Sequence, residues 1–248
     1  MTLSDEQLRE MLALTEQADT VELKLTIPDS AQRSTAAALE VDPLEGQIRQ
    51  VFFFDTPDLA LDSAGVVVRA RRVQGRGDDS VVKLRPIVPG DLSDELRALK
   101  GFGVEVDAMP GGYVCSASMK GVPHNDVRET ILGGGPVHKL FTKHQRALYE
   151  ERAPDGVAMD DLAVLGPLFV LKLKFSPKEL GRKLVAEMWL YPDGSRVVEL
   201  STKCPPSEAF QVAAETRAFL SERDVPLSGE QQTKTRKALD FFSGELAA

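Results

Sequence analysis

The sequence predicts an α+β fold in which a closed antiparallel β-barrel of about eight strands forms a tunnel flanked by helices. Many short segments alternate apolar and polar residues, which is typical of β-strands. The first such segment alternates Val21, Leu23 and Leu25 with polar neighbours that include Glu22 and Lys24. Several later strands also carry charges on one face and apolar side chains on the other. We therefore expect the apolar faces to pack outward against helices and the charged faces to line the barrel.

The composition is that of a folded globular protein, and no break in it marks a linker. The chain has 248 residues, 42% hydrophobic and 27% charged, so we expect a single domain spanning residues 1–248. The formal net charge is −8. That balance excludes a general electrostatic affinity for nucleic acid or anionic lipid, and makes clusters of Lys and Arg informative.

The N-terminal residues 1–7 are acidic and polar, without the basic and apolar regions of a signal peptide. The chain has no run of about 18 apolar residues, so we expect no membrane span. Cys115 and Cys204 are the two cysteines, too few for a disulfide scaffold. The three histidines lack metal-ligand spacing, which argues against zinc. We expect a cytoplasmic protein.

Alternation and turn residues place the strands along the chain. Hairpin turns are expected at residues 75–79, 154–156 and 192–195, where Gly, Asp and Pro gather. The expected strands are residues 20–25, 50–55, 66–72, 80–86, 103–107, 113–118, 141–151, 156–162, 169–175, 184–191 and 196–203.

Capping residues and helical periodicity place the helices. The expected helices, each with its cap where the sequence offers one, are residues 4–17 (Ser4), 29–39 (Asp29 or Ser30), 91–100 (Ser93), 125–132 and two C-terminal helices (Ser207 and Ser228). Residues 133–135 are glycines, and we interpret them as the end of a helix because no phosphate-loop Lys-Ser/Thr follows.

Two neighbouring strands bring four cations together. Arg69 and Arg71 share one face, and so do Lys83 and Arg85 on the returning strand. Like charges opposite each other destabilise a strand pair unless an anion lies between them. This arrangement indicates a bound polyanion.

A barrel interior that also holds Lys24, Lys172 and Lys174 needs compensation, because a buried unpaired charge costs several kcal/mol. Five carboxylates on strand faces can supply part of it: Glu22, Glu105, Asp107, Glu187 and Glu199. A phosphate chain can supply the rest, since Arg and Lys both bind phosphate. The alternative is an open sheet whose charges face solvent in weak ion pairs.

Taken in order, several motifs resemble the CYTH family, also called triphosphate tunnel metalloenzymes. They are Val21-Glu22-Leu23-Lys24, Phe54-Asp55-Thr56-Pro57, Arg69-Ala70-Arg71, Lys83-Leu84-Arg85-Pro86 and Arg146. The resemblance implies an eight-stranded antiparallel tunnel that binds ATP, thiamine triphosphate, inorganic triphosphate or an RNA end. It also implies hydrolysis with Mg²⁺ or Mn²⁺, or cyclisation of ATP as in an adenylate cyclase.

The resemblance also implies roles for individual residues. Glu22, Glu199 and Asp160 (or Asp161) would hold the metal and act in catalysis by in-line attack of water. The phosphate-binding side chains would be Lys24, Arg69, Arg71, Lys83, Arg85 and Arg146. We expect Lys172, Lys174 and Lys203 to add positive charge to the same site. The partner would be a triphosphate-containing small molecule or inorganic polyphosphate, with nucleic acid disfavoured and the oligomeric state not indicated.

Two positions depart from the family pattern. Thr20 stands where the family's Glu-x-Glu-x-Lys has its first glutamate, and Ser201 stands where a second carboxylate would follow Glu199. Hydroxyls are weak ligands for Mg²⁺, so the metal affinity should fall. A tunnel that binds a nucleotide or polyphosphate without turnover is the alternative function, and a barrel whose charges pair internally is a third.

Overall fold

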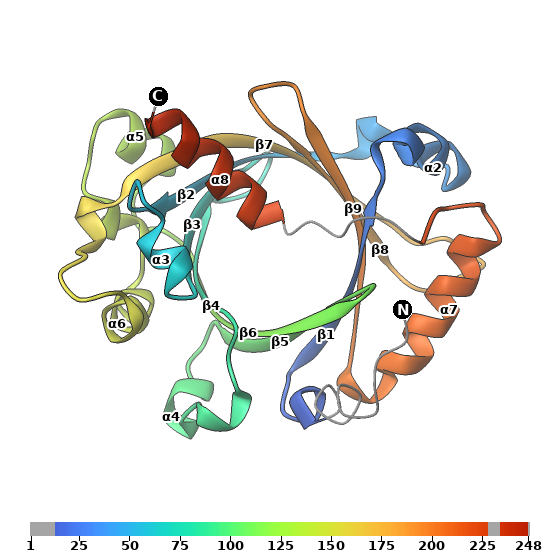
Figure 1. The fold of residues 1–248 in the computed structure, drawn as a ribbon, viewed down its shortest axis with the longest axis horizontal. Coiled ribbons are helices and arrows are strands. Elements are labelled where there is room, and N and C mark those ends of the chain that lie inside the picture. Colours follow the sequence, from blue (N-terminus) through green and yellow to red (C-terminus); the bar gives the residue numbers. More distant parts are fainter. Residues whose placement is uncertain (1–12, 228–233, 248) are drawn as a thin grey trace.

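The computed structural model describes residues 13–227 and 234–247. Within them, nine strands close into a barrel in the order β1-β5-β6-β4-β3-β2-β7-β8-β9 (Figure 1). The strands are β1 (Thr20–Ile27), β2 (Gln47–Asp55), β3 (Val66–Val73), β4 (Asp79–Leu84), β5 (Phe102–Met109), β6 (Gly112–Gly121), β7 (Ala163–Phe175), β8 (Leu184–Leu190) and β9 (Arg196–Cys204). The closed barrel confirms the predicted fold class.

One neighbouring pair differs from the expected antiparallel pattern. β1 and β5 are parallel, with Thr20 opposite Glu105 and Glu22 opposite Asp107, whereas every other neighbouring pair is antiparallel. The barrel is therefore mixed. A parallel pair cannot be joined by a hairpin, so the alternation within each strand contains no signal for it.

Helices and short 3₁₀ turns cover the outside of the barrel. The helices are α2 (Gln32–Ala38), α3 (Ala60–Ser63), α4 (Asp94–Arg97), α5 (Val127–Leu132), α6 (Lys143–Arg152), α7 (Ala209–Ser221) and α8 (Lys234–Ala247). The 3₁₀ turns are η1 (Asp29–Ala31), η2 (Pro43–Glu45), η3 (Pro89–Asp91), η4 (Val137–Leu140), η5 (Met159–Asp161) and η6 (Pro206–Glu208). None of the described helices is long and apolar enough to cross a membrane.

The apolar sides of the strands pack as the alternation predicts. Phe52 and Phe54 on β2 and Val82 on β4 pack with Leu140 and Leu148 from the region of α6. Around β1 and β9, Leu25 and Leu200 pack against Phe219 and Leu220 of α7. Burying each such side chain contributes about 1.5–3 kcal/mol, and this outward packing leaves the barrel interior to the charged faces.

The C-terminal helix α8 lies across the ring of strands, with its first turn near the middle (Figure 1). Its Leu239 and Phe242 pack with Phe53 and Trp189 in one buried cluster. That cluster includes Val51, Val67, Val170 and Trp189, which also line the barrel interior. Helix α8 therefore closes one side of the interior.

The expected strand at residues 141–151 is wrong, because the structure has helix α6 there. Thr142 and Gln145 form a capping box, in which each side chain accepts a hydrogen bond from the other residue's backbone N–H. Gln145, Leu148 and Tyr149 are buried at helical spacing. Gln145 also donates to the Met119 carbonyl at 3.1 Å and accepts from Ser80 Oγ at 3.1 Å, which fixes α6 to β4 and β6.

The expected short strand at residues 156–162 is also wrong. Residues 159–161 of this segment form turn η5, and Met159 and Leu162, three positions apart, are buried. Asp160 accepts hydrogen bonds from the His138 backbone N–H at 2.8 Å and contacts His138 Nδ1 at 2.6 Å. These contacts tie η5 to η4 rather than to a sheet.

Among the predicted caps, Ser93 caps α4 by accepting from Leu96 N at 3.2 Å. Neither Asp29 nor Ser30 caps α2, which begins after turn η1 with Ala31 as its N-cap. The N-cap of α7 is Glu208 rather than Ser207. The caps predicted at Ser4 and Ser228 lie outside the described residues.

Candidate functional site: a charged cavity inside the barrel

The barrel encloses a cavity of about 650 Å³. Among the residues that the structure describes, ten basic side chains and five carboxylates line it, so the wall carries five more positive than negative groups. The whole chain is net negative at −8, which makes this local excess distinctive. The basic residues are Lys24, Arg49, Arg69, Arg71, Lys83, Arg85, Lys120, Lys172, Lys203 and Lys234, and the carboxylates are Glu22, Glu105, Asp107, Glu187 and Glu199.

On the β1 and β5 side, lysines and carboxylates form a compact network. The Lys24 ammonium lies 2.8 Å from Asp107 Oδ1 and 3.4 Å from Glu22 Oε2, and Lys83 lies 3.3 Å from Asp107 Oδ2. Lys203 lies 3.4 Å from Glu22 and also contacts Glu105. Three lysines thus neutralise three carboxylates in this network.

Electrostatics within this network favour the charged forms of its carboxylates. Burial alone would raise the pKa of Asp107, but Lys83 and Lys24 outweigh burial and lower the pKa to about 2. The pKa of Glu22 is lowered because Lys24 and Lys203 outweigh the effect of burial. Burial would lower the pKa of Lys24, but Asp107 and Glu22 raise it above its usual value. Both acids are therefore ionised at neutral pH.

The carboxylates of this network are also close enough to share a cation. Oxygen atoms of Glu22, Glu105 and Asp107 lie within 4.8 Å of one another. Carboxylate oxygens are the ligands that Mg²⁺ and Mn²⁺ prefer. The donor set therefore fits a divalent metal, which would compete with Lys24, Lys83 and Lys203 for the same oxygens.

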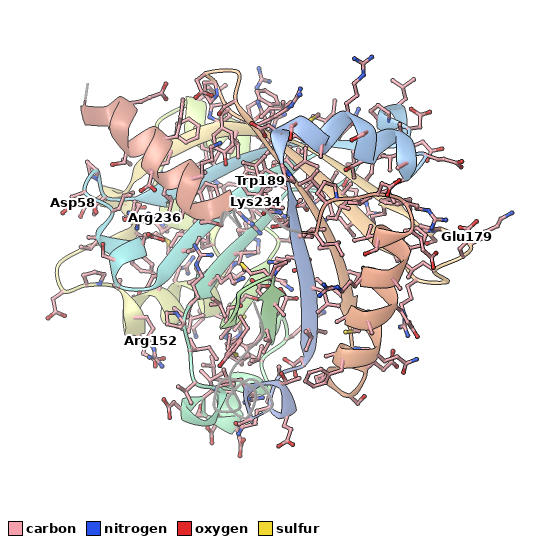
Figure 2. All side chains as sticks on the ribbon, turned by 45° about the vertical axis from the view of Figure 1, so that its right-hand side comes forward. Asp58, Arg152, Glu179, Trp189, Lys234 and Arg236 are labelled. Atoms are coloured by element: carbon pink, nitrogen blue, oxygen red, sulfur yellow. The ribbon has the colours of Figure 1, made fainter. Side chains whose placement is uncertain are left out.

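A second network joins the C-terminal helix to β8 and β9. Lys234 donates to Glu187 Oε2 and to Glu199 Oε1, both at 2.6 Å. Lys172 donates to the other oxygen of Glu187 at 2.6 Å, and Trp189 Nε1 donates to Glu187 at 3.2 Å. Figure 2 shows Lys234 and Trp189 together near the centre of the molecule, with Lys234 Nζ 5.1 Å from the indole ring centroid.

On the β2, β3 and β4 side, the wall is rich in arginine. Arg71 makes a two-point ion pair with Asp79, at 2.7 and 2.8 Å. Arg69 Nε is buried and has no hydrogen-bond partner among the described residues. Arg85 reaches Asp62 only at 3.8 Å. Burial and the neighbouring Arg71 lower the pKa of Arg69 to about 9, so its guanidinium remains protonated at neutral pH and is short of a counter-ion.

Most of the predicted site residues meet in this cavity. Those that line it are Glu22, Lys24, Arg69, Arg71, Lys83, Arg85, Lys172, Glu199 and Lys203. Their side chains come from the charged faces of β1, β3, β4, β7 and β9, because alternation along each strand sends them inward. Their roles in binding and catalysis stay predictions.

Three predicted site residues do not line the cavity. Lys174 is exposed near the end of β7. Arg146 lies on α6, outside the barrel, and donates to the Phe141 carbonyl at 2.9 Å. Asp160 lies on η5 beside His138, and its side chain is 42% exposed. Arg146 and Asp160 lie in segments expected to be strands, and because these segments are α6 and η5 instead, neither side chain reaches the interior.

Three residues that contribute to the charges in and around the cavity are not among the predicted site residues: Arg49, Lys234 and Asp62. Arg49 lies on β2 two residues before Val51, so extending the predicted strand to residue 47 would have placed it on the inward face. Lys234 comes from a helix distant in sequence, and no local pattern brings it to the cavity. Asp62 lies on α3 and bridges Arg85 of the wall to Arg236 of α8, which it meets at 2.7 Å.

Two solved structures of proteins described as adenylate cyclases have the same architecture as this chain. The chain superposes on HpAC1 from Hippeastrum, described as a candidate adenylyl cyclase with a dominant triphosphatase activity, with a TM-score of 0.61 and 20% identity over 89% of this chain and 95% of that chain. A candidate adenylate cyclase from Bacillus halodurans gives a TM-score of 0.58 and 13% identity over 88% and 98% of the two chains. The chain shares their fold.

No family model matches the sequence, and no curated protein matches it. At these identities the likeness concerns the fold alone. It agrees with the fold that the resemblance to the CYTH family implies.

Proposed function

We propose that the cavity binds the phosphate chain of a triphosphate or polyphosphate and that the protein hydrolyses it with a divalent metal. The observation that carries this proposal is the buried Arg69: within the described part of the chain, its Nε lacks a hydrogen-bond partner and the cavity wall has five excess positive groups. A buried cation without a counter-ion is costly unless a ligand supplies the negative charge. Arginine forks and lysine ammonium groups together suit phosphate oxygens.

Glu22, Glu105 and Asp107 are the residues that would hold the metal. Bound there, Mg²⁺ or Mn²⁺ would neutralise phosphate charge and lower the pKa of a coordinated water. Glu105 and Asp107 on β5 lie directly opposite Thr20 and Glu22 of β1. They therefore provide carboxylates beside the position where the family pattern has a glutamate and this chain has Thr20.

The cavity cations would act in binding and on the transition state. Lys83 on β4 and Arg85 just after it, with Arg69 and Arg71 on β3, would orient the phosphate chain and neutralise charge that develops on the transferred phosphoryl group. Burial lowers the pKa of Lys83 more than Asp107 raises it. An incoming phosphate would stabilise the protonated lysine. Cyclisation of ATP would need the same cations to bind the phosphate chain.

The second candidate is a tunnel that binds the anion without turnover. It is favoured by the pairing of all three carboxylates with lysines: Lys24 with Glu22 and Asp107, Lys83 with Asp107, and Lys203 with Glu22 and Glu105. A metal must displace these ammonium groups, which weakens its binding.

A phosphate-release assay separates the two candidates. Tripolyphosphate, ATP and thiamine triphosphate would each be incubated with Mg²⁺ and with Mn²⁺, and binding of each would be measured by calorimetry. Release of phosphate that Glu22→Gln reduces by a hundredfold or more, about 2.7 kcal/mol of barrier, supports hydrolysis. Retained binding with no release supports the second candidate, and absence of both would contradict the proposal.

A further inference from the structure

Arg49 on β2 shares one part of the cavity wall with Arg69 and Arg71 on β3. In the register of these strands, Val51 lies opposite Arg71 and Phe53 lies opposite Arg69. Arg49 is two residues from Val51, so it is a diagonal neighbour of Arg71 on the same face, about 7–8 Å away. All three side chains line the cavity.

Two of these three guanidinium groups have no carboxylate partner in the part of the chain that the structure describes. Asp79 neutralises Arg71 through a two-point contact. Arg49 is nine-tenths buried, yet its Nε and Nη2 donate to the neutral side-chain oxygen of Gln47, at 3.2 and 2.8 Å. Arg69 Nε has no partner, and neither Arg49 nor Arg69 has a carboxylate oxygen within 4.0 Å among the described residues. Gln47 thus holds Arg49 in place without cancelling its charge.

The arginines are separate from the carboxylates that would hold a metal. In the barrel order, β2 and β3 are separated from β1 and β5 by other strands in both directions, so the two groups occupy different walls. The strongest neighbouring influence on the pKa of Arg49 and of Arg69, after burial, is Arg71, and both pKa values are lowered. Lys24 and Lys83 respond mainly to Asp107 after burial.

We infer that Arg49, Arg69 and Arg71 form an anion subsite that holds a phosphoryl group without a metal ion, and that Arg49 is one of its binding residues. This inference rests on the proposed function. Two guanidinium groups without a carboxylate partner, beside a third, suit the oxygens of a phosphoryl group, because each guanidinium can donate two parallel hydrogen bonds and carries a positive charge. The carboxylate network on the other wall would then serve the metal-dependent part of the site.

The test measures tripolyphosphate binding by calorimetry in EDTA, with Arg49→Gln, Arg49→Lys and a matched control. Arg72→Gln is the control, because Arg72 also donates to a β2 glutamine, Gln50, at 2.6 Å but does not line the cavity. Wild type and Arg72→Gln should bind equally without metal. Arg49→Gln should weaken binding about tenfold to a hundredfold, and Arg49→Lys, which keeps the charge but loses the fork, should fall between them.

Thermal unfolding in EDTA checks that the variants fold. Without anion, Arg49→Gln should unfold at a temperature no lower than Arg72→Gln, because it removes a buried charge that has no counter-ion. With tripolyphosphate, the unfolding temperature of Arg72→Gln should rise and that of Arg49→Gln should rise less.

The outcomes distinguish this inference from the proposed function. Binding by wild type only when Mg²⁺ is added would overturn the metal-free subsite and leave the proposed function standing. Equal affinities for Arg49→Gln and Arg72→Gln in EDTA would remove Arg49 from the site. Absence of binding by wild type both with and without Mg²⁺ would overturn the proposed function itself.

Discussion

The Lys234 ammonium lies 2.6 Å from Glu199 Oε1, and this contact joins the C-terminal helix α8 to β9 inside the barrel. Both side chains are largely buried, with 12% and 8% of their surface exposed. Burial alone would lower the pKa of Lys234, but Glu187 and Glu199 raise it. Lys234 is thus charged at neutral pH, and its contact with Glu199 helps to close the cavity.

Replacing Lys234 should destabilise the protein. Lys234→Met leaves Glu187 with Lys172 alone and Glu199 without a cation, so the free energy of unfolding should fall by about 3 kcal/mol. Urea unfolding measures the change. Lys237→Met is the control, since Lys237 Nζ lies over the Tyr191 ring at 4.8 Å from its centroid and has no carboxylate within 4.0 Å among the described residues, so it should cost under about 1 kcal/mol. Equal losses in the two variants would contradict the structural role of Lys234.

Glu187 should make the stability of the protein sensitive to acid. Burial alone would raise its pKa, but Lys234 and Lys172 outweigh burial and hold the pKa well below its usual value. A carboxylate with a lowered folded-state pKa stabilises the protein fully above its unfolded pKa of about 4.3. That stabilisation is lost as the pH falls from there toward the folded-state pKa.

Urea unfolding between about pH 7 and pH 3 tests this dependence. Wild type should lose stability steeply below about pH 4.5, and Glu187→Gln should be less stable at pH 7 and lose less on acidification. Glu179→Gln should follow the wild-type curve, because Glu179 is 67% exposed in its pair with Arg223. A Glu187→Gln curve parallel to that of wild type would show that the lowered pKa has no bearing on stability.

Placing a carboxylate at position 20 should strengthen metal binding. Thr20 Oγ1 donates to Glu105 Oε2 at 3.2 Å, so Thr20→Glu would place a fourth carboxylate beside Glu22, Glu105 and Asp107. The Mg²⁺ or Mn²⁺ concentration needed for half-maximal effect should fall about tenfold. Metal titrations by calorimetry or by phosphate release measure it.

Thr20→Gln separates charge from size in the same experiment. It should leave metal affinity near that of wild type, because an amide adds no negative charge. Without metal, Thr20→Glu should be less stable than Thr20→Gln, since like charges then lie side by side. An unchanged metal affinity in Thr20→Glu would argue against a metal site on β1 and β5.

Residues outside the barrel should be dispensable for anion binding. Asp160→Asn and Arg146→Gln should each change tripolyphosphate affinity by less than about twofold, because neither side chain lines the cavity. A large loss of tripolyphosphate affinity in Asp160→Asn would show that Asp160 does contribute to anion binding.

Arg71→Ala should weaken tripolyphosphate binding about tenfold or more, whereas Arg76→Ala, in the exposed β3–β4 turn, should weaken it less.

The residues that face the cavity from β1, β3, β4 and β9 follow from the sequence itself. Successive side chains in a strand point to opposite sides, so the apolar series Val21, Leu23, Leu25 requires Glu22 and Lys24 to face the other way. The same argument applies to Arg69 and Arg71. A period of two residues is a local property of the backbone, and it is visible without knowledge of strand order.

Only the tertiary structure decided which charges meet. The parallel pairing of β1 with β5 brings Glu105 and Asp107 to Glu22, and the placement of helix α8 brings Lys234 to Glu199. A strand was expected at residues 141–151, but the Thr142–Gln145 capping box and the burial of Gln145 make that segment a helix. Strand order and long-range ion pairs depend on how the barrel closes, because closure sets contacts between residues far apart in the chain, and no local pattern encodes them.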